Sequence, residues 1–251
     1  MLVREIYEYI NSIAPFSAAE SWDNCGLLIG SYNKECKRIM LALDITQSVA
    51  KQAIEGDIDL IITHHPVIFT SLKSIDFDSV IAKLVMAGIC VISSHTCFDT
   101  AQGGMNDILC EKLGLNGVRA VTADDGFSFR IGFLDKPTTA KDFAKLTADA
   151  LDSKCVSYTL GEKMVNSVAV CSGSGGSVCD LVSVLRVDAF VTGELKYNNI
   201  IDLTEAGISS IVAGHFETEY IFKTVIKERI LGIFNDIEVV VADEKPYLMG
   251  V

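Results

Sequence analysis

The four histidines of this chain all stand at or just beyond the end of a short apolar run. His64 and His65 follow DLIIT, His95 follows CVISS, and His215 follows SSIVAG. Such runs are typical of buried strands in α/β sheets, and ligands of open α/β sheets gather at the carboxyl ends of the strands. Imidazole is a common metal ligand, so these positions favour a metal site over histidines that form core hydrogen bonds.

Two carboxylates accompany the histidines. Glu219 lies four residues after His215, and a helix predicted to begin near Thr218 lets both side chains face one point. Asp99 lies four residues after His95, beyond the apolar run CVISS. Three histidines with two carboxylates suit borderline divalent ions such as Zn, Fe, Mn, Ni or Co better than calcium, which prefers oxygen ligands alone.

The adjacent histidines indicate how many ions to expect. Neighbouring side chains of a strand point to opposite faces, so His64 and His65 would each bind a different ion. A single ion would leave one of them unexplained. Two ions about 3.5–4 Å apart can share a bridging carboxylate and a water, which then loses a proton near neutral pH and becomes a nucleophile. The chemistry that the pattern predicts is metal-dependent hydrolysis.

Alternating strand-length apolar runs and helical segments indicate an α/β fold with largely parallel sheets. Strands are predicted at 37–45, 59–65, 90–96, 167–173, 189–194, 209–215 and 237–243. Helices are predicted at 2–13, 48–56, 78–88, 104–115, 140–151 and 218–234. Acids and glycine interrupt this rhythm over 121–136, which places a domain boundary near residue 125 and predicts domains at 1–125 and 126–251. We find no sequence repeat strong enough to indicate duplication.

Composition excludes several classes of protein. The net charge of −12 argues against a nucleic-acid partner, because phosphate backbones are bound by clustered lysine and arginine. The eight cysteines include no CxxC pair, which indicates reduced, packed thiols. No apolar run approaches the roughly 20 residues that span a bilayer, and the N-terminus carries acids rather than the bases of a secretory signal. We expect a cytoplasmic protein without a membrane partner.

Five motifs carry a resemblance to a known family. They are SWDNCGLLIG (21–30), DLIITHHPVIF (59–69), SSHTCFDTAQGGMND (93–107), VTGELKYNN (191–199) and GHFETE (214–219). With these motifs the sequence resembles the GTP cyclohydrolase I type 2 homologues, also described as Ngg-interacting-factor-three-like proteins. The resemblance covers the full chain and is to the compact bacterial form, which lacks a long inserted middle domain.

The resemblance implies two intertwined α/β domains, with a dinuclear metal centre in the cleft between them. It also implies a homohexameric, toroidal ring whose metal sites face an internal cavity. The ligands that it implies are His64, His65, Asp99, His215 and Glu219, with Glu219 bridging two divalent ions per chain. His95 and Trp22 are then expected to line the site, although Trp22-Asp23-Asn24 also reads as a packed turn.

One departure from the family concerns proton transfer. In VTGELKYNN the family commonly has aspartate where Glu194 stands and histidine where Asn198 stands. An amide does not ionise near neutral pH and cannot shuttle protons as a general acid or base, so His95 and Glu194 become the candidate catalytic residues. Asn106 is a weaker candidate, because helix capping alone explains an amide in a first helical turn.

The function expected is a dinuclear divalent-metal-dependent hydrolase acting on a nucleotide or related small molecule. It would open a guanine ring, as in a GTP cyclohydrolase, or cleave a phosphoester. The loop CSGSGG (171–176) would cradle a phosphate or be a plain turn. The alternative is a non-catalytic ring that stores or senses metal or acts as a scaffold for a protein partner.

Overall fold

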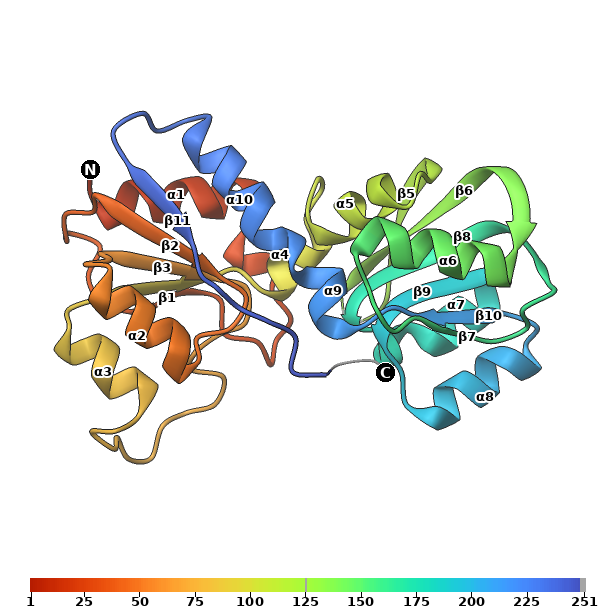
Figure 1. Cartoon of the computed structure of the whole chain (residues 1–251), viewed down its shortest axis with the longest axis horizontal. Coiled ribbons are helices and arrows are strands. Elements are labelled where there is room, and N and C mark those ends of the chain that lie inside the picture. Colours follow the sequence, from red (N-terminus) through yellow and green to blue (C-terminus); the bar gives the residue numbers. More distant parts are fainter. Residues whose placement is uncertain (125, 249–251) are drawn as a thin grey trace. The chain divides into compact units, whose positions relative to one another are not determined.

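The computed structural model describes residues 1–124 and 126–248, and the chain folds into two compact units (Figure 1). Unit 1 comprises Met1–Ala101 and Tyr220–Lys245, and unit 2 comprises Gln102–Glu219 with the segment from Pro246 onward. Each unit is therefore discontinuous in sequence, and the chain alternates between them. The boundary predicted at residue 125 lies outside the described residues.

Unit 1 is a five-stranded sheet covered by helices on both faces. Its elements are α1 (Val3–Ile13), η1 (Phe16–Ala18), β1 (Gly26–Ile29), β2 (Arg38–Ala42), α2 (Gln47–Glu55), β3 (Leu60–Thr63), α3 (Val80–Met86), β4 (Cys90–Ser93), α4 (Thr96–Thr100), α10 (Ile221–Leu231) and β11 (Glu238–Val241). The strand order is β1-β4-β3-β2-β11; β1 alone runs antiparallel to its neighbour. Helices α2 and α3 pack on one face, and α1 and α10 lie on the other (Figure 1).

Unit 2 is a six-stranded mixed sheet. Its elements are α5 (Met105–Lys112), β5 (Asn116–Thr122), β6 (Ser128–Thr139), α6 (Ala140–Leu151), β7 (Ser157–Tyr158), β8 (Met164–Ser174), η2 (Gly175–Val178), α7 (Cys179–Leu185), β9 (Ala189–Glu194), α8 (Tyr197–Glu205), β10 (Ser209–Val212) and α9 (His215–Glu219). The strand order is β5-β6-β8-β9-β10-β7, and β8, β9 and β10 are parallel. Helices α7 and α8 contribute Val182 and Leu203 to the core on one face of this sheet.

The two units repeat one order of elements. Helix α1 followed by β1-β2-α2-β3-α3-β4-α4 corresponds to α6 followed by β7-β8-α7-β9-α8-β10-α9. In both, three consecutive parallel strands adjoin a short antiparallel edge strand, which is β1 in unit 1 and β7 in unit 2. The architecture is thus duplicated, although the sequence analysis found no repeat strong enough to indicate this.

A lysine–aspartate pair fixes the start of the parallel strands in unit 1. The Lys34 ammonium donates to the carbonyls of Asp59 (3.1 Å) and Gly88 (2.7 Å), and the Asp59 carboxylate accepts from the amides of Lys37 and Arg38. Burial alone would raise the pKa of Asp59, but these two amides and the nearby Lys34 outweigh it and hold the pKa below its usual value. The ionised carboxylate therefore stabilises this end of the sheet.

Unit 2 contains the same arrangement at the corresponding strands. Lys163 donates to the carbonyls of Asp188 (3.0 Å) and Gly207, and the Asp188 carboxylate accepts from the amides of Asn166 and Ser167. The pKa of Asp188 is lowered in the same way: burial opposes the shift, and the bonds from the Ser167 amide and hydroxyl and from Asn166 overcome it. The shared arrangement supports the correspondence of the two units at the level of single side chains.

All seven predicted strands are confirmed, and the four residues of β3 and of β4 are buried throughout, as their continuous apolar runs require. The predicted start of the last helix near Thr218 is wrong: α9 begins at His215 and α10 follows separately. Within the described residues, no helix has the length and apolar character needed to span a membrane.

Candidate metal-binding residues

Three histidines of unit 1 converge at the carboxyl ends of β3 and β4. His64 and His65 directly follow β3, and His95 lies two residues after β4. One ring nitrogen from each of the three lies within 4.8 Å of the other two. Because β3 and β4 are adjacent and parallel, their carboxyl ends bring the histidines together, as the sequence predicted.

The adjacent histidines lie closer together than strand alternation would place them. Strand β3 ends at Thr63, so His64 and His65 belong to the turn beyond it. Their ring centroids are 5.1 Å apart, and the ring planes are tilted by 46°. Two imidazoles in this turn are thus available as ligands on the same side of the sheet edge.

Each of these three rings has its Nδ1 atom beside a protein acceptor. The pairs are His64 with the Ser94 carbonyl at 3.0 Å, His65 with Asp44 at 2.8 Å and His95 with Asp23 at 2.9 Å. An acceptor at Nδ1 favours the tautomer that carries its proton there and its lone pair on Nε2. Histidines that bind metals through Nε2 are held by such partners in almost every case.

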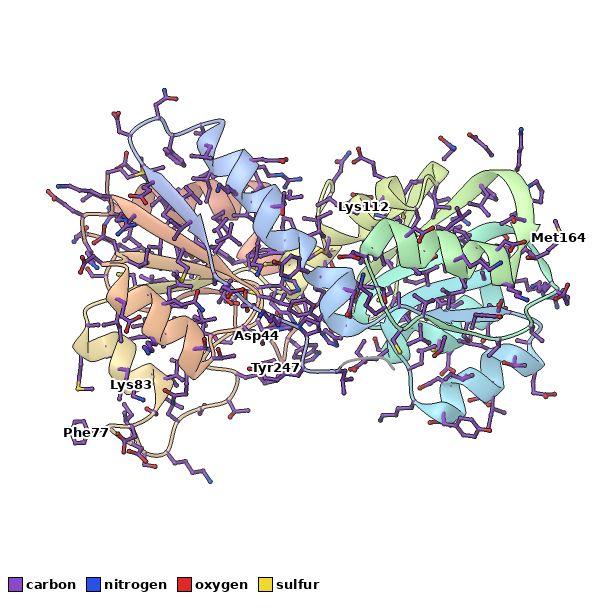
Figure 2. All side chains as sticks on the ribbon, in the orientation of Figure 1. Asp44, Phe77, Lys83, Lys112, Met164 and Tyr247 are labelled. Carbon is purple, nitrogen blue, oxygen red and sulfur yellow. The ribbon has the colours of Figure 1, made fainter. Side chains whose placement is uncertain are left out.

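Asp44 is itself fixed by a buried ion pair. The Glu244 carboxylate accepts from the amides of Leu43 and Asp44, each at 2.9 Å, and pairs with the Lys223 ammonium at 2.8 Å. The side chains of Lys223 and Glu244 are 1% and 7% exposed. Asp44, which Figure 2 labels, therefore leaves β2 in a turn whose backbone is anchored by a charged group.

Asp23 connects the SWDNCG motif to the His95 segment. Besides His95 Nδ1, its carboxylate accepts from the Thr96 amide (3.1 Å) and hydroxyl (2.6 Å), at the start of α4. Burial would raise the pKa of Asp23, but hydrogen bonds from His95 and Thr96 outweigh it and hold the pKa well below its usual value. Helix α4 in turn carries Asp99, whose Oδ1 lies 3.6 Å from Nε2 of His64.

In unit 2 the candidate group is formed by one histidine and two carboxylates. Helix α9 begins at His215, and Glu219 Oε2 lies 3.1 Å from Nε2 of that histidine, one turn along the helix. Nδ1 of His215 faces Glu194 Oε1 at 3.3 Å, at the end of β9. Glu194 is thus placed to orient the ring, in the same way as Asp44 and Asp23 in unit 1.

Gly173, in the last residues of β8, makes room for this pair; the sequence CSGSGG, predicted as a loop, forms the end of β8 and the start of η2. Gly173 has a φ of +56°, and a Cβ atom there would lie 2.2 Å from Glu219 Oε1 and 3.1 Å from His215 Nε2. A larger residue would displace the carboxylate as well as strain the backbone. The end of β8 therefore packs closely against the candidate ligands of its own unit.

The histidines and carboxylates occupy corresponding places in the two units. After β4 the chain reads His95-x3-Asp99, and after β10 it reads His215-x3-Glu219. In both units the short helix that follows the strand carries the carboxylate. The combined nitrogen and oxygen donors fit a borderline divalent ion.

The weaker candidate Asn106 has a structural role, and Asn198, which replaces the histidine common in the family, lies at the surface. Asn106 is buried in unit 2; its Oδ1 accepts from the Ser172 amide at 2.7 Å and its Nδ2 donates to the Ser128 carbonyl at 3.3 Å. It therefore ties helix α5 to the sheet. Asn198 is exposed in the first turn of α8.

Sequence reasoning missed Asp44 and Gly173, and left Asp23 undecided between a packed turn and the site. A signal for Asp44 was present, because it ends the apolar run of β2 beside the strand that carries the histidine pair. Gly173 carried no comparable signal, since its need for space comes from residues more than 40 positions away.

The chain matches the family model Duf34/NIF3 (NGG1p interacting factor 3) over residues 1–246. It is 32% identical to a Clostridium perfringens protein named GTP cyclohydrolase 1 type 2 homolog, with 97% of both chains covered. It is 33% identical to the GTP cyclohydrolase 1 type 2 of Helicobacter pylori strain J99, with 93% of both covered.

Two solved structures share the fold over nearly the whole length. A Staphylococcus aureus protein superposes with a TM-score of 0.90 at 24% identity, covering 100% of this chain and 99% of that one. Reduced HcgD from Methanocaldococcus jannaschii superposes with a TM-score of 0.82 at 28% identity, covering 97% and 98%.

Proposed function

Because this chain belongs to the Duf34/NIF3 family, we propose that it is a hydrolase that requires two divalent metal ions and acts on a nucleotide or a related small molecule. One observation supports the proposal above all others: every histidine of the chain has Nδ1 beside a protein acceptor, which favours a lone pair on Nε2. A histidine that binds a metal through Nε2 almost always donates its Nδ1–H to such a partner.

The proposed ligands are His64, His65 and Asp99 from unit 1 and His215 and Glu219 from unit 2. When bound, the ions would act as Lewis acids and lower the pKa of a water molecule. Zn, Fe, Mn, Ni and Co all suit this set of imidazole and carboxylate donors. Asp99 and Glu219 occupy corresponding positions in the short helices that follow β4 and β10, which supports a role for both units in metal binding.

The remaining polar residues would orient ligands and move protons. His95 donates from Nδ1 to Asp23, so its Nε2 can accept a proton, and the ionised Asp23 carboxylate would stabilise the imidazolium that forms. Asp44 would hold His65, and Glu194 would hold His215. We assign Glu194 this orienting role in preference to direct proton transfer, because its carboxylate faces the ring nitrogen opposite the ligand position.

The names of the relatives support a guanine nucleotide as the first substrate to test, since both proteins described above are named for GTP cyclohydrolase activity. The homohexameric ring that the family resemblance implies belongs to the same proposal. Light scattering during size-exclusion chromatography tests it, with an expected mass of six chains of 27.2 kDa each.

The function is tested by turnover with the metal-loaded protein. GTP is assayed by loss of the guanine absorbance and by release of formate, and a panel of phosphate mono- and diesters by release of phosphate or alcohol. We expect turnover by the wild type and a loss of about 100-fold or more in His95→Gln, with metal content unchanged. Wild type that holds metal but turns over none of these compounds would contradict the hydrolase and favour a metal-storing or scaffold protein.

A further inference from the structure

Two large aromatic side chains of unit 1 are exposed beside His95. Trp22, the only tryptophan in the chain, is 51% exposed, and Phe69 is 50% exposed. Their ring centroids are 5.6 Å apart. The His95 ring lies 6.0 Å from Trp22 and 6.4 Å from Phe69, so both rings border the proposed proton acceptor.

The backbone that carries this pair is fixed by hydrogen bonds. Asn24 Nδ2 donates to the Ile68 carbonyl at 2.6 Å, which joins the residues next to Trp22 and Phe69. Trp22 Nε1 donates to Glu20 Oε2 at 2.5 Å. The indole N–H is therefore occupied within the protein, and what Trp22 presents to a ligand is its apolar ring.

We propose that Trp22 and Phe69 form an aromatic platform that binds the planar heteroaromatic ring of the substrate by stacking. The inference rests on the proposed function and specifies the substrate class of the same site. Exposed aromatic rings fixed beside a polar cluster are a common means of binding bases, because every base has a π-face. The carboxylates of Glu20 and Asp23 lie at the same segment, and their negative charge disfavours a phosphate there.

The position of the platform distinguishes two kinds of reaction. A ring that stacks on Trp22 or Phe69 lies close to His95, whereas the phosphates of the same nucleotide would extend away from the carboxylates beside it. Proton transfer by His95 would then act on the ring. The platform therefore favours hydrolysis within a heterocycle over cleavage of a phosphoester.

Binding is measured with guanosine 5′-monophosphate and, as a control that keeps the sugar and phosphate, ribose 5-phosphate. Because Trp22 is the only tryptophan, its fluorescence reports the platform directly. We expect saturable quenching by guanosine 5′-monophosphate and none by ribose 5-phosphate. Quenching that follows protein concentration rather than nucleotide concentration would overturn the platform and indicate self-association at this surface.

Variants are compared by calorimetry with the metal-loaded protein. Trp22→Ala and Phe69→Ala should each raise the Kd for guanosine 5′-monophosphate by about 5- to 100-fold, and Trp22→Phe should stay within about 3-fold of wild type. Phe77→Ala is the matched control: Phe77 is 79% exposed and lies in the loop before α3, where Figure 2 labels it. Equal affinity in Trp22→Ala and Phe77→Ala would overturn the platform.

Metal content, measured for every variant, separates this inference from the proposed function. Variants that keep their metal while losing nucleotide affinity support the platform. Wild type that binds guanosine 5′-monophosphate through Trp22 but holds no metal would retain the platform and contradict the proposed hydrolase. Wild type that holds metal and binds the nucleotide without any change in Trp22 fluorescence would contradict the platform alone.

Discussion

Replacing Glu244 with leucine should destabilise unit 1 strongly, because it removes one partner of a buried ion pair. The Lys223 ammonium lies 2.8 Å from Glu244 Oε2, in side chains that are 1% and 7% exposed. The same carboxylate accepts from the amides of Leu43 and Asp44. Glu244→Leu therefore leaves a buried cation without its counter-charge and two amides without their acceptor.

The magnitude follows from the burial. Removing one partner of a buried ion pair typically costs about 3–5 kcal/mol. Because the Lys223 ammonium keeps a second acceptor, the Ala242 carbonyl at 3.2 Å, we expect the lower part of that range, about 3–4 kcal/mol. The double variant Lys223→Met/Glu244→Leu removes both charges, and only the unsatisfied amides remain, so we expect a cost of about 1–2 kcal/mol.

The assay is urea unfolding of the metal-free protein at pH 7, followed by the fluorescence of Trp22, which lies in unit 1 with the ion pair. The free energy of unfolding is compared among wild type, Glu244→Leu and the double variant. A cost below about 1 kcal/mol for Glu244→Leu, or a double variant less stable than the single one, would refute the reasoning.

Three further predictions follow from individual side chains. Asp44→Asn should weaken metal binding about 10- to 100-fold by loosening the ring of His65, as measured by competition with a chelator; unchanged affinity would argue against an orienting role. Gly173→Ala should lower both metal content and the urea midpoint, because its Cβ would lie 2.2 Å from Glu219 Oε1; a fully loaded variant would contradict this. Since the pKa of Asp59 in the folded protein lies below its ordinary value of 3.8, the stabilisation by this carboxylate is present above that pH and is lost as the pH falls through the folded pKa. The advantage of wild type over Asp59→Asn in urea midpoint should accordingly shrink as the pH falls below 3.8, and a constant difference would refute this.

The sequence was sufficient for seven strands and for the grouping of the histidines, because both depend on local patterns, but strands β1, β5, β6 and β7 and helices α4, α7 and α8 were not predicted. The runs that became β3 and β4 are continuous in apolar residues, and the polar residues begin where each strand ends. The start of α9 was misplaced by three residues, since Gly214 adopts a φ of +99° immediately before His215 and lets the helix begin there. The pattern of apolar and polar residues does not predict the backbone conformation of a single glycine such as Gly214.

Features that depend on residues far apart in the chain could not be predicted from local sequence patterns. The chain returns to unit 1 at Tyr220, and Glu238 of β11 pairs with Arg38 of β2, 200 residues earlier in the chain. Strand β7 has only two residues, which is too short for any apolar pattern to reveal. Asp44 orients the His65 ring through a contact between residues 21 positions apart, which the sequence alone does not predict.

The central claim is that the chain binds two metal ions and that His65 and Glu219 are among their ligands. The most direct measurement is metal content per chain by elemental mass spectrometry, on protein purified without added metal or chelator, for wild type, His65→Ala in unit 1 and Glu219→Ala in unit 2. We predict about two ions per wild-type chain and a clear loss in each variant. Wild type that stays empty after reconstitution, or a Glu219→Ala protein that keeps both ions, would contradict the account.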